Sequence, residues 1–147
     1  IFKIVIVPVL LGLIFNYFFH GKAKWLDKAM PIISMAGIGF IIMIITAAGR
    51  DDLLSIGLLL ILAAIIHNLL GYVFGYWGCR IFGMSEQDCR TIAFEVGMQN
   101  GGLATGIALE MGKISTVGLA PAIFGPWMNI SGSSLATWWR DKEPKKK

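Results

Sequence analysis

Long apolar runs separated by short charged stretches constrain this chain more than any other feature. The runs cover approximately residues 2–19, 31–48, 53–77, 89–111 and 114–139. About 20 apolar residues in a helix cross the hydrocarbon core of a bilayer. Charged residues make up only 15% of the chain, against about 25% in soluble domains. The sequence therefore predicts an all-α integral membrane protein with five transmembrane segments.

Polar residues and glycines interrupt the fourth run. It reads Glu95-Val96-Gly97-Met98-Gln99-Asn100, followed by Gly101 and Gly102. A glycine costs a helix interior about 1 kcal/mol relative to alanine, so we predict an interruption over residues 95–102. Broken membrane helices must line a cavity or be buried in protein, and many secondary transporters build ion and substrate sites at such breaks. A charged residue within a membrane segment is a candidate functional residue.

The distribution of Lys and Arg predicts the orientation. With the C-terminus inside, three of these thirteen residues lie outside, namely Lys3, Arg50 and Lys113. The other ten lie inside: Lys22, Lys24, Lys28, Arg80, Arg90, Arg140, Lys142, Lys145, Lys146 and Lys147. The positive-inside rule favours this arrangement, with a cytosolic C-terminus and an external N-terminus. The net charge of +4 is explained by these loops and does not indicate nucleic-acid binding.

Several short patterns predict local structure. Pro31 suits the first turn of the second segment. Ser85 followed by Asp88 resembles a helix-capping box. Gly71 and Gly75 have the spacing that lets two helices approach closely.

Two pairs of residues leave alternatives open. Cys79 and Cys89 are interpreted as reduced thiols near the cytosolic boundary, with a disulfide as the alternative. His67 and Asn68 lie in the middle of the third segment. They form either a hydrogen-bonded pair packed between helices, which we favour, or part of a proton relay.

Three motifs resemble the bile acid:sodium symporter family. They are Val7-Pro8-Val9-Leu10-Leu11-Gly12-Leu13, the stretch from Glu95 to Asn100 with Leu103-Ala104 behind it, and Trp127-Met128-Asn129-Ile130-Ser131-Gly132 with Leu135-Ala136. They occur in the family's order and spacing over nearly the whole chain. The resemblance implies a fold of ten spans in two inverted five-span repeats, of which this sequence matches the second. A chain that starts outside on an apolar residue agrees with a second half.

The resemblance also implies a domain organisation. Residues 1–50 are expected to be two panel-domain spans, residues 51–139 three core-domain spans including the broken helix, and residues 140–147 a charged cytosolic tail. The expected partners are the lipid bilayer, an organic anion and the first five-span repeat, on the same chain or a separate subunit. The expected location is a bacterial inner membrane.

The resemblance implies specific site residues. Glu95 and Gln99 are expected to bind sodium through their side chains, and Val96 and Met98 through their backbone carbonyls. Three other residues, Asn100, Asn129 and Met128, are expected at the substrate. Relatives that bind bile acids can carry a polar residue, often His, at the position of Met128, which favours a smaller organic acid here.

Each site residue also has a structural interpretation. Glu95 could be a loop residue, and Gln99 and Asn100 could join helices by hydrogen bonds. A hard cation nevertheless needs several oxygen ligands, which this stretch supplies at close spacing.

The sequence therefore predicts sodium-coupled transport of an organic anion, either a bile acid or a small carboxylate such as a keto acid or pantoate. Na⁺ is the coupling ion, and no organic cofactor is expected. The sequence has no nucleophile–base set, phosphate loop or His/Cys metal cluster, so an enzyme is not expected. The alternative function is a non-transporting helical membrane scaffold or assembly subunit.

Overall fold

The computed structural model describes residues 2–19 and 24–142. Its regular structure is helical throughout these residues, which confirms the all-α class. A π-helical turn, η1 (Phe2–Ile6), leads into α1 (Val7–Phe19), α2 (Lys24–Ala48), α3 (Arg50–Ile81), α4 (Glu86–Gly97), α5 (Gly101–Glu110) and α6 (Leu119–Arg140). The predicted loop residue Lys22 and the tail residues Lys145, Lys146 and Lys147 lie outside the described residues.

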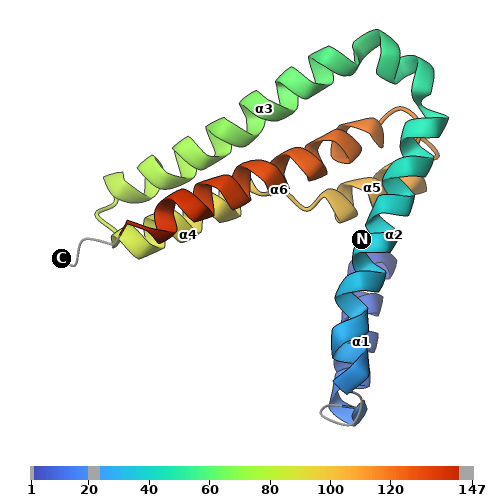
Figure 1. The fold of residues 1–147 in the computed structure, drawn as a ribbon, viewed down its shortest axis with the longest axis horizontal. Coiled ribbons are helices and arrows are strands. Elements are labelled where there is room, and N and C mark those ends of the chain that lie inside the picture. The colour runs from blue at the N-terminus through green and yellow to red at the C-terminus, as the bar shows by residue number, and fades with distance from the viewer. Residues whose placement is uncertain (1, 20–23, 143–147) are drawn as a thin grey trace.

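The helices form two groups set at a steep angle (Figure 1). One group contains α3, α4, α5 and α6, and the other consists of α1 and α2, which extend away from it. The bend lies where α2 is followed by α3, with Gly49 between them. The assignment of residues 1–50 to a panel domain and residues 51–139 to a core domain stays a prediction.

A small apolar core holds the bend together. The side chains of Ile45, Leu119 and Ala122 are buried there, and apolar residues of α2, of α3 and of the connection between α5 and α6 pack against them. A Cβ atom on Gly49 would overlap the carbonyl oxygen of Ser115, so only glycine fits the corner without rearrangement. The start of α6 is thereby fixed against the junction between α2 and α3.

Two glycines let α3 and α4 approach closely. A Cβ atom on Gly71 would lie 2.8 Å from Gly97 Cα and 2.8 Å from the Val96 carbonyl oxygen. On Gly75 it would lie 2.8 Å from the Ile92 carbonyl oxygen. The predicted packing role of this glycine pair is confirmed.

Helix lengths bear on how the chain crosses a bilayer. Within the described residues, Lys28–Ala48 and Arg50–Ile81 are long and apolar enough to span a membrane. Apolar side chains of α1 and α2 are largely exposed, as a lipid-facing or partner-facing surface would be. With 12 and 10 residues, α4 and α5 are each at most about 18 Å long at about 1.5 Å per residue. Together they match the thickness of one bilayer core, about 30 Å. Five spans remain a prediction.

The structure corrects two predicted helix boundaries. Pro31 lies inside α2, not at its first turn, because α2 already begins at Lys24. The interruption predicted over residues 95–102 is narrower and includes only Met98, Gln99 and Asn100. Glycine is tolerated here because Gly97 ends α4 and Gly101 begins α5, so neither occupies the middle of a helix.

A polar cluster at the end of the bundle holds α3, α4 and α6 together. The Arg90 guanidinium donates to Glu86 Oε1 at 3.0 Å and to the Trp139 carbonyl at 3.0 Å, while the Tyr76 hydroxyl donates to Glu86 Oε2 at 2.8 Å. Burial by itself raises the pKa of Glu86, but these hydrogen bonds and the charges of Arg90 and Arg80 outweigh it and hold the pKa below its usual value. Glu86 is therefore ionised at neutral pH.

Two predictions about the residues around the connection between α3 and α4 are confirmed, the helix cap and the two free thiols. Ser85 caps α4, since its Oγ accepts from the Asp88 N–H at 3.1 Å. Cys79 and Cys89 are free thiols, and both are buried.

Candidate functional site

The break between α4 and α5 is an ordered connection of three residues. The Met98 N–H donates to the Phe94 carbonyl at 2.8 Å and closes the last turn of α4. Asn100 then caps α5, because its Oδ1 accepts from the Leu103 N–H at 2.9 Å. This is the usual way to satisfy a donor at a helix N-terminus. The C-terminus of one half-helix and the N-terminus of the next therefore lie three residues apart.

Side-chain amides hold the last carbonyls of α4. Gln99 Nε2 donates to the Val96 carbonyl at 2.9 Å, and Asn68 Nδ2 donates to the Gly97 carbonyl at 2.9 Å. Among the described residues, the Met98 carbonyl accepts no backbone hydrogen bond. A carbonyl oxygen has two lone pairs, so those of Val96 and Met98 can still coordinate a cation.

Charge at the break favours a cation beside α4. Glu95 lies in the last turn of α4, is exposed, and has no hydrogen bond or ion pair within the described part of the chain. A helix C-terminus carries a partial negative charge, so a carboxylate there adds to it. The N-terminus of α5 has the opposite polarity and favours an anion. One short break thus offers a cation-favouring end and an anion-favouring end.

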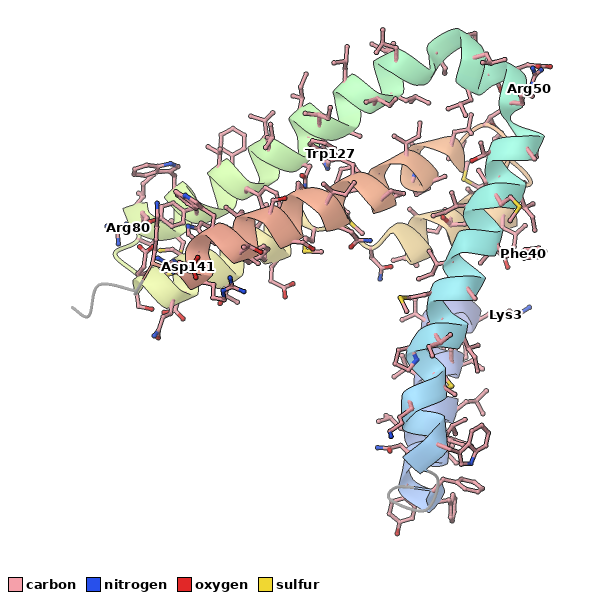
Figure 2. The ribbon with its side chains drawn as sticks, in the orientation of Figure 1. Lys3, Phe40, Arg50, Arg80, Trp127 and Asp141 are labelled. Carbon is pink, nitrogen blue, oxygen red and sulfur yellow. The ribbon has the colours of Figure 1, made fainter. Side chains whose placement is uncertain are left out.

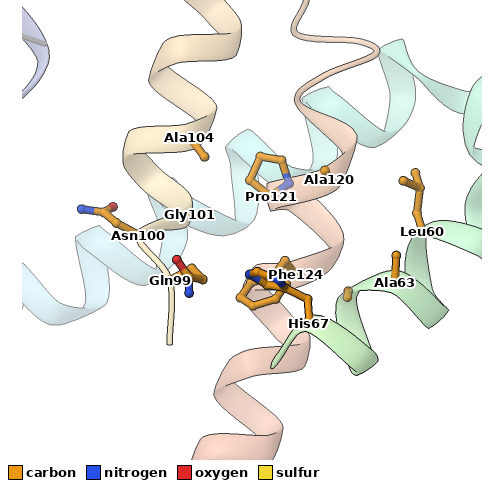
Figure 3. Close-up of a pocket in the computed structure, with 11 residues that line it drawn as sticks. Leu60, Ala63, His67, Gln99, Asn100, Gly101, Ala104, Ala120, Pro121 and Phe124 are labelled. Atoms are coloured by element: carbon orange, nitrogen blue, oxygen red, sulfur yellow. The ribbon is translucent and has the colours of Figure 1, made fainter. Parts of the chain in front are cut away.

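An open pocket of about 420 Å³ lies beside the break, between α3, α5 and α6 (Figure 3). Its lining is mostly apolar: Leu60, Ala63, Ala64, His67, Gln99, Asn100, Gly101, Ala104, Ala120, Pro121 and Phe124. Its polar side chains come from His67, Gln99 and Asn100. Figure 3 shows the Asn100 side chain pointing away from His67 and Phe124. The pocket therefore suits a small molecule with an apolar body.

His67 and Asn68 have different surroundings in the structure. Asn68 is fully buried and hydrogen-bonded between helices, which confirms the favoured interpretation for this residue. His67 instead lines the pocket, with its ring 5.6 Å from that of Phe124 in an edge-to-face arrangement. The two residues thus do different things, although they are adjacent in sequence.

The second predicted motif lies on α6. Asn129 is exposed and is not among the residues that line the pocket, so the structure does not bring it together with Asn100 there. Met128 is half-buried, and its carbonyl oxygen lies 3.2 Å from Ser131 Oγ. The indole N–H of Trp127 is buried without a hydrogen-bond partner among the described residues.

Sequence reasoning missed two polar residues at the break. Ser131 Oγ donates to Asn68 Oδ1 at 2.6 Å and lies 3.2 Å from the Tyr72 hydroxyl. Tyr72 lies in an apolar run, and Ser131 lies in the third motif but was given no role of its own. A buried amide requires hydrogen-bond partners, but the sequence does not show which residues supply them.

Apolar helices with an ordered polar break are typical of a helical membrane protein, and many secondary transporters have such breaks. Comparison with known proteins agrees. A sequence model described as "Sodium Bile acid symporter family" matches residues 1–56. The chain is 39% identical over 147 residues to the "Uncharacterized sodium-dependent transporter YocS" of Bacillus subtilis (strain 168), covering 99% of this chain and 45% of that protein.

A plant relative is similar over almost as much of the chain. The "Probable sodium/metabolite cotransporter BASS1, chloroplastic" of Arabidopsis thaliana is 30% identical over 143 residues, covering 97% of this chain and 36% of that protein. The chain thus spans less than half the length of these relatives. The resemblance to the sodium bile acid symporter family is confirmed.

Proposed function

We propose that this chain forms one half of a sodium-coupled symporter for an organic anion. The observation that carries the proposal is the break at residues 98–100, where Glu95 and the C-terminus of α4 face the N-terminus of α5 across three residues. Two relatives are named as a sodium-dependent transporter and a sodium/metabolite cotransporter, which supports sodium as the coupling ion. The other half is a matching five-span repeat, on the same chain or a separate subunit.

The proposed sodium ligands are all oxygens. They are the side chains of Glu95 and Gln99 and the backbone carbonyls of Val96 and Met98. A hard cation prefers several such ligands. Sodium at this place neutralises the carboxylate and the negative end of α4, which removes the cost of holding a bare charge within the membrane.

The proposed substrate binds beside the sodium site. Its carboxylate faces the N-terminus of α5, where Asn100 already orders the first turn and the helix dipole favours an anion. We propose Met128 and Asn129 on α6 as further substrate contacts, although neither residue lines the pocket in this structure. Alternating access then follows from movement of the core helices against the panel helices.

Replacing Asn100 or Asn129 with Ala is expected to weaken uptake of the anion while leaving sodium binding largely intact. Because Met128 is apolar, a small carboxylate such as pantoate is expected to compete better than a conjugated bile acid. Competition uptake in liposomes and sodium binding measure the two effects separately. If a variant loses anion uptake and sodium binding equally, the amide supports the fold or the ion site and not the substrate. A strong preference for the bile acid over the small carboxylate would refute the proposed substrate class.

The proposed topology places Arg50 and Asp141 on opposite sides of the membrane, and Figure 2 shows them at opposite ends of the bundle. The neighbouring Asp51 side chain is 96% exposed and that of Asp141 is 73% exposed. The Asp51→Cys variant is expected to react with a membrane-impermeant maleimide added outside. The Asp141→Cys variant is expected to react with the same maleimide only when it is added inside. Reaction of both from the same side would contradict the orientation.

A further inference from the structure

Asn68 is a polar side chain fully buried within an apolar helix. Its Nδ2 donates to the Gly97 carbonyl at 2.9 Å, and its Oδ1 accepts from Ser131 Oγ at 2.6 Å. A carbonyl can only accept, so the amide nitrogen must face Gly97 and the amide oxygen must face Ser131. Partners on α4 and α6 therefore hold this α3 side chain in one orientation.

Hydrogen bonds on both sides also fix the Ser131 hydroxyl. Its hydroxyl proton points to Asn68, the closest acceptor, which leaves its oxygen to accept from the Tyr72 hydroxyl at 3.2 Å. The next residue, Gly132, lets Met98 reach α6, since a Cβ atom on Gly132 would lie 3.2 Å from Met98 Sδ. The chain around the break and the middle of α6 are therefore joined at this point by hydrogen bonds and packing.

The anchored carbonyl belongs to a glycine. Gly97 lies between Val96 and Met98, whose carbonyls are proposed sodium ligands, and glycine restricts its own backbone least. Peptide planes are rigid and share Cα atoms, so fixing one carbonyl limits the directions of its neighbours. The Asn68 amide, which lies on α3, therefore restrains the direction of the Gly97 carbonyl, which the glycine backbone alone does not fix.

We infer that Asn68 and Ser131 are positioning residues that hold the break in its sodium-binding geometry; this inference rests on the proposed function. Neither residue is among the proposed sodium ligands, so both act through the Gly97 carbonyl. The pair also joins residues 95–100 to residues 127–132, the two motifs that contain all the predicted site residues. The state of the break is thereby coupled to the stretch of α6 that carries Met128 and Asn129.

Sodium binding alone tests this role. The full-length protein in detergent is titrated with ²²Na⁺, without substrate, and its melting temperature is measured without sodium. Ser131→Ala is expected to raise the sodium concentration at half-saturation by about tenfold or more. Ser131→Thr keeps the hydroxyl and is expected to restore most of the affinity.

Ser134→Ala is the matched control, because Ser134 lies on the same helix and, within the described residues, its Oγ donates only to the Ile130 carbonyl, at 2.8 Å. It is expected to leave sodium affinity unchanged within about twofold. The sodium-free melting temperatures of the Ser131→Ala and Ser134→Ala variants are expected to stay within a few degrees of each other. A merely structural hydrogen bond would lower stability without a selective loss of sodium affinity.

Equal sodium affinity in the Ser131→Ala and Ser134→Ala variants would overturn the inference, and so would a loss of affinity that parallels a loss of sodium-free stability. If Ser131→Ala does not fold, Tyr72→Phe decides, since it removes only the hydroxyl that donates to Ser131. A smaller rise in the half-saturating sodium concentration supports the inference, and no rise overturns it. A wild-type protein that binds no sodium would instead refute the proposed function itself.

Discussion

Replacing Glu95 with Gln is expected to lower sodium-dependent uptake by well over tenfold, which corresponds to more than about 1.4 kcal/mol of lost stabilisation. The substitution keeps the size of the side chain and one oxygen atom but removes its charge. That charge lies at the negative end of α4, next to the carbonyl of Val96, where it has no positive partner among the described residues. Glu95→Asp retains the charge on a shorter side chain and is expected to work at higher sodium concentrations.

Glu110→Gln provides the control for this change. Glu110 is also an exposed carboxylate, at the last residue of α5, but lies a full half-helix away from the break. Its replacement is expected to leave uptake within about twofold of the wild type. Normal transport by the Glu95→Gln variant would show that the carboxylate is a surface residue and that the sodium site lies elsewhere.

Replacing Gly71 with Ala is expected to destabilise the protein by about 1–3 kcal/mol, the usual cost of overpacking. The added Cβ atom would lie 2.8 Å from the Val96 carbonyl oxygen and from Gly97 Cα. Both are backbone atoms at the end of α4, so the helix itself must move. We therefore expect a lower melting temperature together with weaker sodium binding.

Gly78→Ala is the matched control on the same helix. A Cβ atom on Gly78 would meet no atom within 4 Å among the described residues, apart from its chain neighbours and the backbone of its own helical turn. Alanine also favours a helix over glycine by up to about 1 kcal/mol. The melting temperature is expected to stay the same or rise slightly. If the Gly71→Ala variant is as stable as Gly78→Ala, the close contact between α3 and α4 is not as the structure describes it.

Local sequence signals predicted much of this fold. Apolar runs located the helices, Ser85 with Asp88 predicted the start of α4, and Gly71 with Gly75 predicted a close helix contact. These signals work because each depends on residues within a turn or two of one another. Pro31 shows their limit, since the same residue suits a first turn and is tolerated inside α2, where the lost hydrogen bond is a local cost.

The site was predicted less completely than the helices. Polar residues within an apolar run located the break. The range predicted from the glycines was too wide, because Met98 still closes the last turn of α4 and Asn100 already caps α5. The hydrogen bonds of Asn68 join residues that are 29 and 63 positions apart. No spacing rule reaches over such distances, so Ser131 and Tyr72 could be found only from the folded structure.

Uptake driven by an ion gradient tests the central claim most directly. The full-length protein in liposomes is given radiolabelled pantoate, pyruvate or a conjugated bile acid, with an inward gradient of either sodium or protons. The break at residues 98–100, with Glu95 beside it, predicts that at least one of these anions accumulates under the sodium gradient and that a sodium ionophore abolishes the accumulation. Uptake that follows the proton gradient and ignores sodium would contradict the account.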